Sequence, residues 1–336
     1  MLRTGRQHFI SVRGLDATEI GNLFALASRL RSLDHKERSL LLEGRVVATA
    51  FYQPSTRTRM AFEAGALRLG ATVTGFAEAR TTRAGDFYQE TLEDVVCNLG
   101  WVADAVVLRH FESGAAARAA AVSPVPVINA GDGYNEHPSQ ALGDVWAMHQ
   151  ALGGVEGARI GLLGNPHIRS LHSISLVLAK LAPAEVVFLP APGTEVPQDT
   201  REAFAQHAVR WSQVDDARDL LAGCDLVETI GTRHPNHQLA RQDAGSVDDS
   251  TPDRFRIDAG KIAGLARPPV ILHPGPRTDE IDVDVDRLSV AQYLPQVGHG
   301  MWMKAAMLAV SLCEPAALPS GPTDSASARI HLGAGS

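Results

Sequence analysis

The residues with the clearest chemical potential follow a short apolar run near the start of the chain. Residues 46–50 predict a buried strand, and residues 60–70 predict a helix that ends at a glycine. Between them lie hydroxyl and guanidinium side chains in close succession: Ser55, Thr56, Arg57, Thr58 and Arg59. A helix start offers free N–H groups and a positive dipole end, which together attract anions. The segment therefore predicts a phosphate site, although an ordinary Ser cap on a basic surface helix would use the same residue types.

Further polar side chains follow other predicted strands, at or just past their carboxyl ends. They are Arg109, His137, Gln140, Arg169 and the turn 273–277 with its Pro274 and Gly275. Ligands of open parallel sheets bind at these strand ends. The agreement in position predicts that these residues share one site with the phosphate segment.

Each of these side chains suits a particular group of a small anionic substrate. His137 and Gln140 are three apart at a helix start, so they share a face; a histidine can donate to a carbonyl oxygen, and a glutamine amide can hold an NH₂ group. Arg169 suits a carboxylate. The rigid carbonyls near Pro274 can accept from an NH₂ group. Taken singly, the same residues also fit a strand-capping arginine, a solvated histidine–glutamine pair and an ordinary tight turn.

Two other kinds of site have weaker support. His234 and His237 could suggest a metal, but Pro235 lies between them and the sequence offers no obvious third ligand, so we expect no metal. The glycines at 161 and 164 lack the Gly-x-Gly-x-x-Gly spacing of a dinucleotide site. We expect no cofactor.

The alternation of strands and helices predicts the fold class. Strands are expected at 45–51, 72–76, 104–108, 125–129, 159–163, 185–189, 225–229 and 269–272, and most are followed by a helix. This pattern is typical of α/β proteins with parallel sheets flanked by helices. We predict two domains with the active site in the cleft between them: 1–150, with a C-terminal helix 290–313 packing back on it, and 151–289, followed by a disordered tail at 314–336.

Composition excludes several classes of function. The chain has 336 residues, 45% hydrophobic and 21% charged, with a formal net charge of −7. The negative charge argues against a nucleic-acid partner, and no apolar run is long enough to span a membrane. The N-terminus lacks a signal-peptide core, so we expect a cytoplasmic protein. Cys97, Cys224 and Cys313 are far apart and predict buried free thiols.

Taken together, these motifs resemble the aspartate/ornithine carbamoyltransferase family, over residues 8 to about 312. The segments that carry the resemblance are 51–59, Arg109-His110, 129–133, 137–140, 169–173 and 272–281. The turn His273-Pro274-Gly275-Pro276 is closer to the aspartate branch, because ornithine-type enzymes carry His-Cys-Leu-Pro there.

The resemblance implies transfer of a carbamoyl group from carbamoyl phosphate to the amine of aspartate, in pyrimidine biosynthesis. It implies that Ser55, Thr56, Arg57, Thr58 and Arg109 bind the phosphate, and that Thr58, Arg109 and His137 polarise the carbonyl. It further implies that Gln140, Pro274 and Gly275 hold the carbamoyl NH₂, and that Arg169 binds the acceptor carboxylate. Family members are trimers whose sites lie at subunit boundaries, so we expect a homotrimer with shared sites; a regulatory or partner subunit is a further candidate.

The chain departs from the family pattern on the acceptor side. The loop that normally supplies a lysine from the neighbouring subunit contains none here, and Arg80 or Arg83 are the available replacements. The loop that normally carries Arg-x-Gln for the side-chain carboxylate offers Arg233 without a glutamine at the expected spacing. Two alternatives therefore stay open: a carbamoyltransferase for a different amine in a specialised pathway, and a non-catalytic paralogue that serves as an assembly or regulatory subunit.

Overall fold

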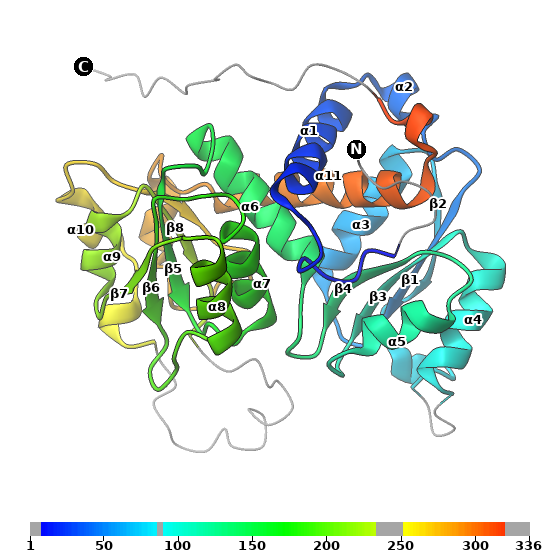
Figure 1. Ribbon diagram of the computed structural model, residues 1–336, viewed down its shortest axis with the longest axis horizontal. Helices are drawn as coiled ribbons and strands as arrows, with labels where there is room; N and C mark the ends of the chain where they lie inside the picture. The colour runs from blue at the N-terminus through cyan, green and yellow to red at the C-terminus, as the bar shows by residue number, and fades with distance from the viewer. Residues whose placement is uncertain (1–7, 86–89, 233–250, 320–336) are drawn as a thin grey trace.

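Two parallel β-sheets, each covered by helices, form the framework of the protein (Figure 1). The computed structural model describes residues 8–85, 90–232 and 251–319. The first sheet has the strand order β2-β1-β3-β4, and the second has the order β7-β6-β5-β8-β9. Every neighbouring pair of strands in both sheets runs parallel. The predicted fold class is confirmed.

The strands follow the apolar runs of the sequence. The first sheet contains β1 (Val46–Phe51), β2 (Thr72–Phe76), β3 (Ala105–His110) and β4 (Val127–Asp132). The second contains β5 (Arg159–Gly164), β6 (Glu185–Pro190), β7 (Trp211–Gln213), β8 (Leu226–Thr229) and β9 (Val270–Leu272).

The helices lie mainly between consecutive strands. The first half contains α1 (Ala17–Ser32), α2 (His35–Ser39), α3 (Thr56–Arg68), α4 (Leu92–Val102), α5 (Ala115–Val122) and α6 (Pro138–Leu152). The second half contains α7 (Arg169–Leu178), α8 (Gln198–Gln206), α9 (Ala217–Gly223), α10 (Ala259–Ala263) and α11 (Tyr293–Leu312). Short 3₁₀ turns occur at Ala79–Thr81, Asp253–Phe255, Val283–Arg287 and Pro315–Ala317.

Strand β1 shows why helices cover both faces of the first sheet. Val47 and Phe51 point to one face and join a core cluster that includes Phe62 of α3. Ala48 and Ala50 point to the other face and pack with residues of α4 and α5. Because side chains alternate along a strand, a continuous apolar run supplies both layers at once.

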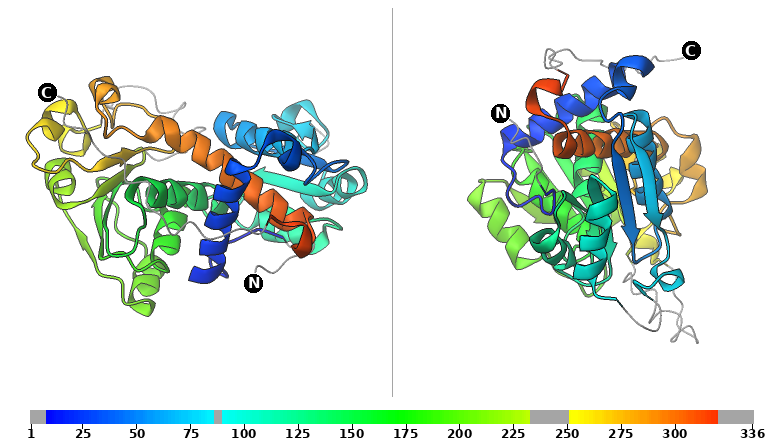
Figure 2. Two further views of the ribbon diagram at one scale, coloured as in Figure 1. Left: turned by 90° about the horizontal axis from the view of Figure 1, so that it is seen from above. Right: turned by 90° about the vertical axis from the view of Figure 1, so that its right-hand side faces the viewer.

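Helices α6 and α11 connect the two halves. Figures 1 and 2 show α6 running between the sheets and α11 crossing back from the second half over the first. There α11 contacts α1, α3 and α6. The largest core cluster includes Trp146 of α6, Met307 of α11 and Leu162 of β5, so the halves share buried apolar side chains. The domain limits themselves stay a prediction.

The structure differs from the sequence prediction at several element ends. Helix α3 begins at Thr56 rather than at residue 60, so the phosphate segment forms its first turn. Helix α11 runs from Tyr293 to Leu312, close to the predicted 290–313, and it tolerates Gly298 and Gly300 in its interior. The three-residue β7 was missed, since its sequence has no apolar run. Of the three cysteines, all free, Cys97 is only half-buried.

Several predictions fall on residues that the structure does not describe. Arg233, His234, His237 and most of the C-terminal tail lie outside the described residues. Within the described ranges, no helix combines the length and apolarity needed to cross a membrane.

Candidate active site

The first turn of α3 presents the hydroxyl and guanidinium groups of the predicted phosphate segment. Ser55 is the N-cap residue, with an extended backbone, but its side chain makes no capping hydrogen bond. Asp16, in contrast, caps α1 by accepting from the Glu19 N–H. The Ser55 hydroxyl is therefore not used to complete its own helix, and the interpretation as a simple helix cap loses its basis.

A pocket at this helix start brings together residues from four parts of the chain. It lies between α3, α6, α11 and the turn that follows β9. Its lining is formed by Arg57, Thr58, Ala61, Gln140, Asp144, His273, Pro274, Gln296, Val297, Gly300 and Lys304. Four predicted site residues, Arg57, Thr58, Gln140 and Pro274, thus share one pocket.

Arg109 and His137 lie in direct contact. The strand β3 extends to His110, so Arg109 lies within the strand rather than after it. Its Nη1 atom is 3.3 Å from His137 Nε2 and 3.3 Å from the Ala130 carbonyl oxygen. A guanidinium can only donate, so Nε2 of His137 accepts and the ring proton is on Nδ1, 3.3 Å from the Ser139 hydroxyl.

The arginines of the site form a cationic group in which Arg109 and Arg169 are partly buried and Arg57 is exposed. Burial, together with the charges of Arg169 and Arg57, lowers the pKa of Arg109 to about 9. Burial lowers the pKa of Arg169 to about 10. Burial and then Arg109 also hold the pKa of His137 well below its usual value, so this imidazole is neutral at neutral pH.

Arg169 is held by neutral partners. It donates to Gln53 Oε1 at 3.2 Å and to the Gly133 carbonyl at 2.9 Å. Among the described residues, no carboxylate forms an ion pair with Arg57, Arg109 or Arg169. Partly buried positive charges without a paired carboxylate carry a desolvation cost, and a site of this kind is suited to an anionic ligand.

Gly131 allows Arg169 and His137 to approach the last residues of β4. It has a φ of +110°, and a Cβ atom there would lie 3.0 Å from Arg169 Nε and 3.1 Å from His137 Cδ2. The Gly131 N–H donates to Asn129 Oδ1 at 2.7 Å, and Asn129 Nδ2 donates to Asp132 Oδ1 at 2.9 Å. These hydrogen bonds fix the backbone of residues 129–133 in a position next to Arg169 and His137.

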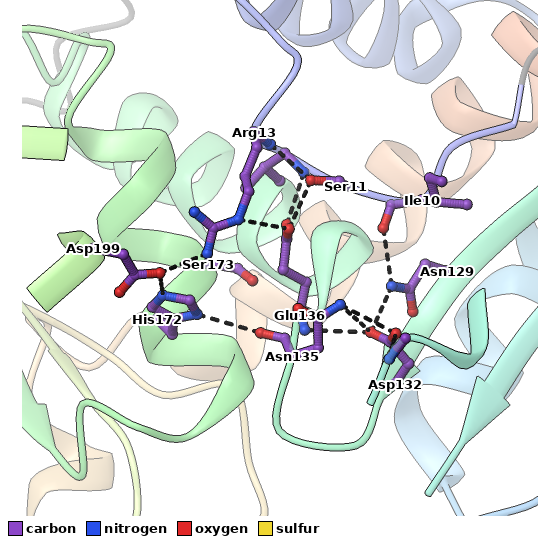
Figure 3. A network of polar contacts seen from close by, with 12 residues as sticks. Ile10, Ser11, Arg13, Asn129, Asp132, Asn135, Glu136, His172, Ser173 and Asp199 are labelled. Atoms are coloured by element: carbon purple, nitrogen blue, oxygen red, sulfur yellow. Dashed lines mark hydrogen bonds and ion pairs between the residues drawn. The ribbon is translucent and has the colours of Figure 1, made fainter. Parts of the chain in front are cut away.

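A polar network anchors the residues just before His137 (Figure 3). Glu136 accepts from the Ser11 hydroxyl at 2.6 Å and from Arg13 Nε at 3.3 Å. Arg13 also reaches Asp199 of α8 at 2.6 Å, and His172 of α7 lies 2.8 Å from the same carboxylate. The N-terminal segment therefore ties the His137 loop to helices of the second half.

Comparison with known proteins decides the family. Residues 7–150 match the model described as aspartate/ornithine carbamoyltransferase, carbamoyl-P binding domain. The chain is 34% identical over 317 residues to the chloroplastic aspartate carbamoyltransferase of Oryza sativa subsp. japonica, covering 90% of this chain and 84% of that protein. The chain belongs to the aspartate/ornithine carbamoyltransferase family.

Solved structures of carbamoyltransferases agree with this assignment. The catalytic subunit of M. jannaschii aspartate transcarbamoylase has a TM-score of 0.78 at 31% identity, covering 91% of this chain and 97% of that one. Aspartate transcarbamoylase from Trypanosoma cruzi, in complex with carbamoyl phosphate and aspartate, has a TM-score of 0.81 at 29% identity, covering 94% and 98%. The resemblance inferred from the motifs is confirmed.

The turn after β9 packs against the phosphate segment. His273 Nδ1 accepts from the Gly275 N–H at 2.7 Å, and Nε2 donates to Glu280 Oε1 at 2.6 Å. Although burial raises the pKa of Glu280, hydrogen bonds from His273 and Thr278 lower it to about 2. Gly275 has a φ of +73°, and a Cβ atom there would lie 2.8 Å from Arg57 Nε.

The acceptor side of the carbamoyltransferase site is less complete in the described residues. Arg233 lies outside them. Arg80 is exposed in the turn Ala79–Thr81, where its Nε is 3.6 Å from Glu78. The predicted roles of Arg80 and Arg83 at a neighbouring site depend on an assembly that a single chain does not show, and they stay predictions.

Sequence reasoning missed a second set of pocket residues. Asp144, Gln296 and Lys304 line the pocket, and Gln296 contacts the buried Glu228. Asp144 lies one helical turn after Gln140, and this spacing was the available signal. Gln296 has no comparable signal, because it lies on a helix that reaches the pocket only through the fold. The described residues contain no cluster of metal-ligating side chains.

Proposed function

We propose that this chain transfers the carbamoyl group of carbamoyl phosphate to the α-amine of aspartate. A C–N bond forms between the amine nitrogen and the carbamoyl carbon, and the bond from that carbon to the phosphate oxygen breaks. The nitrogen loses a proton, and the products are N-carbamoyl-L-aspartate and inorganic phosphate. This product would serve pyrimidine biosynthesis.

The cationic group of Arg57, Arg109 and Arg169 carries the proposal. Arg57, Arg109 and Arg169 converge where no described carboxylate pairs with them, next to a neutral His137. Both substrates are anions, and each needs guanidinium donors, one for a phosphate and one for carboxylates. The Oryza sativa relative is named an aspartate carbamoyltransferase, and the Trypanosoma cruzi aspartate transcarbamoylase was solved with carbamoyl phosphate and aspartate bound.

The carbamoyl-phosphate half of the site is assigned to α3, α6 and the turn after β9. In this assignment Ser55, Thr56, Arg57 and Thr58 hold the phosphate at the helix start. Gln140 Oε1 and the carbonyls of Pro274 and Gly275 accept from the carbamoyl NH₂. Catalysis then rests on orientation and on stabilising the oxyanion of the tetrahedral intermediate, without a covalent enzyme intermediate.

Thr58, Arg109 and His137 are assigned to the carbamoyl oxygen. In the structure, His137 Nε2 accepts from Arg109, so it cannot donate to a carbonyl in that arrangement. We expect substrate to draw the Arg109 guanidinium toward the phosphate and the His137 proton to move to Nε2. A neutral imidazole with its proton on Nε2 is the form that donates to a developing oxyanion.

Arg169 is assigned to the α-carboxylate of aspartate, with Arg233 for the second carboxylate. The missing loop lysine leaves Arg80 or Arg83 to supply a charge from a neighbouring subunit, which requires a trimer. We include the homotrimer with shared sites, and a cytoplasmic location, in the proposal; the plant relatives carry names that place them in the chloroplast.

Phosphate release from carbamoyl phosphate, measured with a panel of amino acids, tests the acceptor. We expect phosphate release with L-aspartate. L-ornithine and L-asparagine should give little release, because each has only one carboxylate. Release with another amine and none with aspartate would move the assignment to a different carbamoyltransferase. Binding of carbamoyl phosphate without release in any case would identify a non-catalytic paralogue.

A further inference from the structure

Three buried polar side chains beside the pocket take no part in the reaction as described. Asp144 of α6 is 1% exposed, Gln296 of α11 is 3% exposed and Glu228 of β8 is fully buried. Burying two carboxyl groups is expensive, and an apolar core of the same volume would be cheaper. Because they lie next to the carbamoyl-phosphate half of the site despite this cost, we expect them to have a function there.

The backbone N–H of His273 fixes which end of the Gln296 amide donates and which end accepts. It donates to Gln296 Oε1 at 2.8 Å, so the other end of that amide must be its NH₂. The Gln296 NH₂ then donates to Asp144 Oδ1 at 2.8 Å and to Glu228 Oε1 at 3.0 Å. The two orientations of a side-chain amide are often hard to distinguish. Here they can be told apart, because the His273 backbone N–H can only donate and must therefore face Oε1.

The orientation of the Gln140 amide, which is assigned to the carbamoyl NH₂, can be determined in the same way. Its Nε2 donates to Asp144 Oδ1 at 2.8 Å and Oδ2 at 3.0 Å. An ionised carboxylate only accepts, so the Gln140 amide must turn its NH₂ toward Asp144. Within the described part of the chain, Gln140 Oε1 accepts no hydrogen bond. Gln140 Oε1 is therefore available to accept a hydrogen bond from a ligand in the pocket.

We propose that Asp144, held by Gln296, is a positioning residue that orients the Gln140 amide and so makes the site select an acyl phosphate bearing an NH₂ group. The inference rests on the proposed function, because it assumes that the pocket receives the carbamoyl end of the substrate. Asp144 itself does not touch substrate; it acts through Gln140.

Gln296 contacts both groups of residues that are assigned to the carbamoyl NH₂. Its carbonyl end holds the His273 N–H, which begins the turn carrying Pro274 and Gly275, and its NH₂ end holds Asp144. Acceptors from α6 and from the turn are thereby linked through one side chain of α11. Glu228 takes the second N–H of that amide, so the amide is bonded at each of its polar atoms.

The charges around Asp144 are consistent with this role. Burial raises the pKa of Asp144, and burial followed by Asp144 raises that of Glu228 well above its usual value. Lys304, also buried, lies on the same pocket and lowers the pKa of Asp144. The arrangement favours one ionised carboxylate next to one ammonium, with that carboxylate free to accept from Gln140.

Acetyl phosphate is the probe that isolates this selection, because a methyl group replaces the NH₂ and the phosphate is unchanged. The variant Asp144→Asn has the same shape but can donate to Gln140 Oε1, which would turn the Gln140 NH₂ toward the pocket. We expect kcat/KM for carbamoyl phosphate, relative to that for acetyl phosphate, to fall by roughly 10- to 100-fold. The change should vanish when Asp144→Asn is made in a Gln140→Ala background.

Two controls separate selection from damage to the fold. Met148→Leu alters the same helix one turn further on, at a fully buried apolar site, and should leave the substrate ratio unchanged. Should Asp144→Asn fail to fold, Gln296→Met tests the same link, since it removes the donor to Asp144, and the same criterion applies. A folded variant with an unchanged ratio, or equal losses on both substrates, overturns the proposal.

The failure of the proposed function would look different. If the wild-type chain releases no phosphate with any amine, binding of carbamoyl phosphate and acetyl phosphate is measured by calorimetry instead. A wild-type preference for carbamoyl phosphate that Asp144→Asn abolishes would support the positioning role while contradicting the transferase. A preference that is absent in the wild type, or retained in the variant, would contradict the positioning role.

Discussion

At the scale of single residues, the central feature is a group of positive charges for which the described part of the chain supplies no carboxylate partner. Elsewhere the chain pairs its arginines in the usual way, as Arg59 does with Glu63 at 2.7 Å and Arg45 with Asp104 at 2.8 Å. Arg109 instead faces other cations, and their charges contribute to its lowered pKa. The difference indicates that the missing counter-charge is the ligand.

Replacing Arg109 tests whether this charge serves the reaction. We expect Arg109→Lys to lower kcat/KM for carbamoyl phosphate by about 10²–10³-fold, because an ammonium cannot donate to the phosphate and the carbonyl oxygen together. Steady-state kinetics measure the effect. Arg201→Lys, on the exposed side of α8, is the matched control and should behave as wild type. Equal activity of the two variants would contradict the assignment.

The protonation of His137 gives a second prediction at this scale. Its pKa is held well below the ordinary value of 6.5, first by burial and then by Arg109, so the ring should stay neutral as the pH falls from about 8 to about 6. ¹⁵N NMR should show the proton on Nδ1 in the free protein and on Nε2 after addition of N-(phosphonacetyl)-L-aspartate. An imidazolium signal near pH 6 would refute this account of the site.

At the scale of elements, the phosphate segment and the turn after β9 have to meet closely. Gly275 makes this possible, since its φ of +73° suits glycine and a side chain there would collide with Arg57. The two elements are more than two hundred residues apart in the chain. Their contact is therefore a property of the fold, and it turns two ordinary motifs into one pocket.

Gly275→Ala should displace Arg57 and raise the KM for carbamoyl phosphate at least about 10-fold, with a loss of stability of roughly 1 kcal/mol from the positive φ. Gly193 offers a close control: its φ is also +73°, but a Cβ atom there would meet nothing within 4 Å. Gly193→Ala should lose similar stability, measured by thermal unfolding, and keep its KM. Matching KM values for the two variants would show that the contact with Arg57 is unimportant.

The sequence allowed the strands, the phosphate segment and the strand-end residues to be predicted, because each depends on local patterns. The apolar runs predicted β1 and β5 to within one residue, and the helix start predicted at His137 and Gln140 is the start of α6. The Asp144–Gln296–Glu228 group could not be predicted, because its members lie on α6, α11 and β8. Their contacts depend on how α11 returns across the first half, which no local pattern encodes.

At the scale of the whole molecule, the two halves are joined both by packing and by polar contacts. Helix α11 packs on α1, α3 and α6, while Arg13 bridges Glu136 and Asp199. The proposed acceptor side extends beyond one chain, because the proposal has Arg80 or Arg83 act on a neighbouring subunit. That part of the proposal therefore depends on an assembly.

Sedimentation equilibrium should give a mass of about 107 kDa, three times the 35.8 kDa of one chain. Mixing two inactive variants then tests the shared site. If the loop acts on a neighbour, co-assembled Arg109→Ala and Arg80→Ala/Arg83→Ala chains should regain part of the wild-type activity, because some sites then contain only intact groups. A monomer, or a mixture that stays inactive after co-assembly, would count against the trimer with shared sites.

The most direct measurement follows the carbamoyl carbon itself. With ¹³C-labelled carbamoyl phosphate and L-aspartate, NMR should show the label passing into N-carbamoyl-L-aspartate while inorganic phosphate appears in equal amount, and heat-inactivated protein should show neither. If the label decays only by the spontaneous breakdown of carbamoyl phosphate, at the rate seen without protein, the chain is not an aspartate carbamoyltransferase.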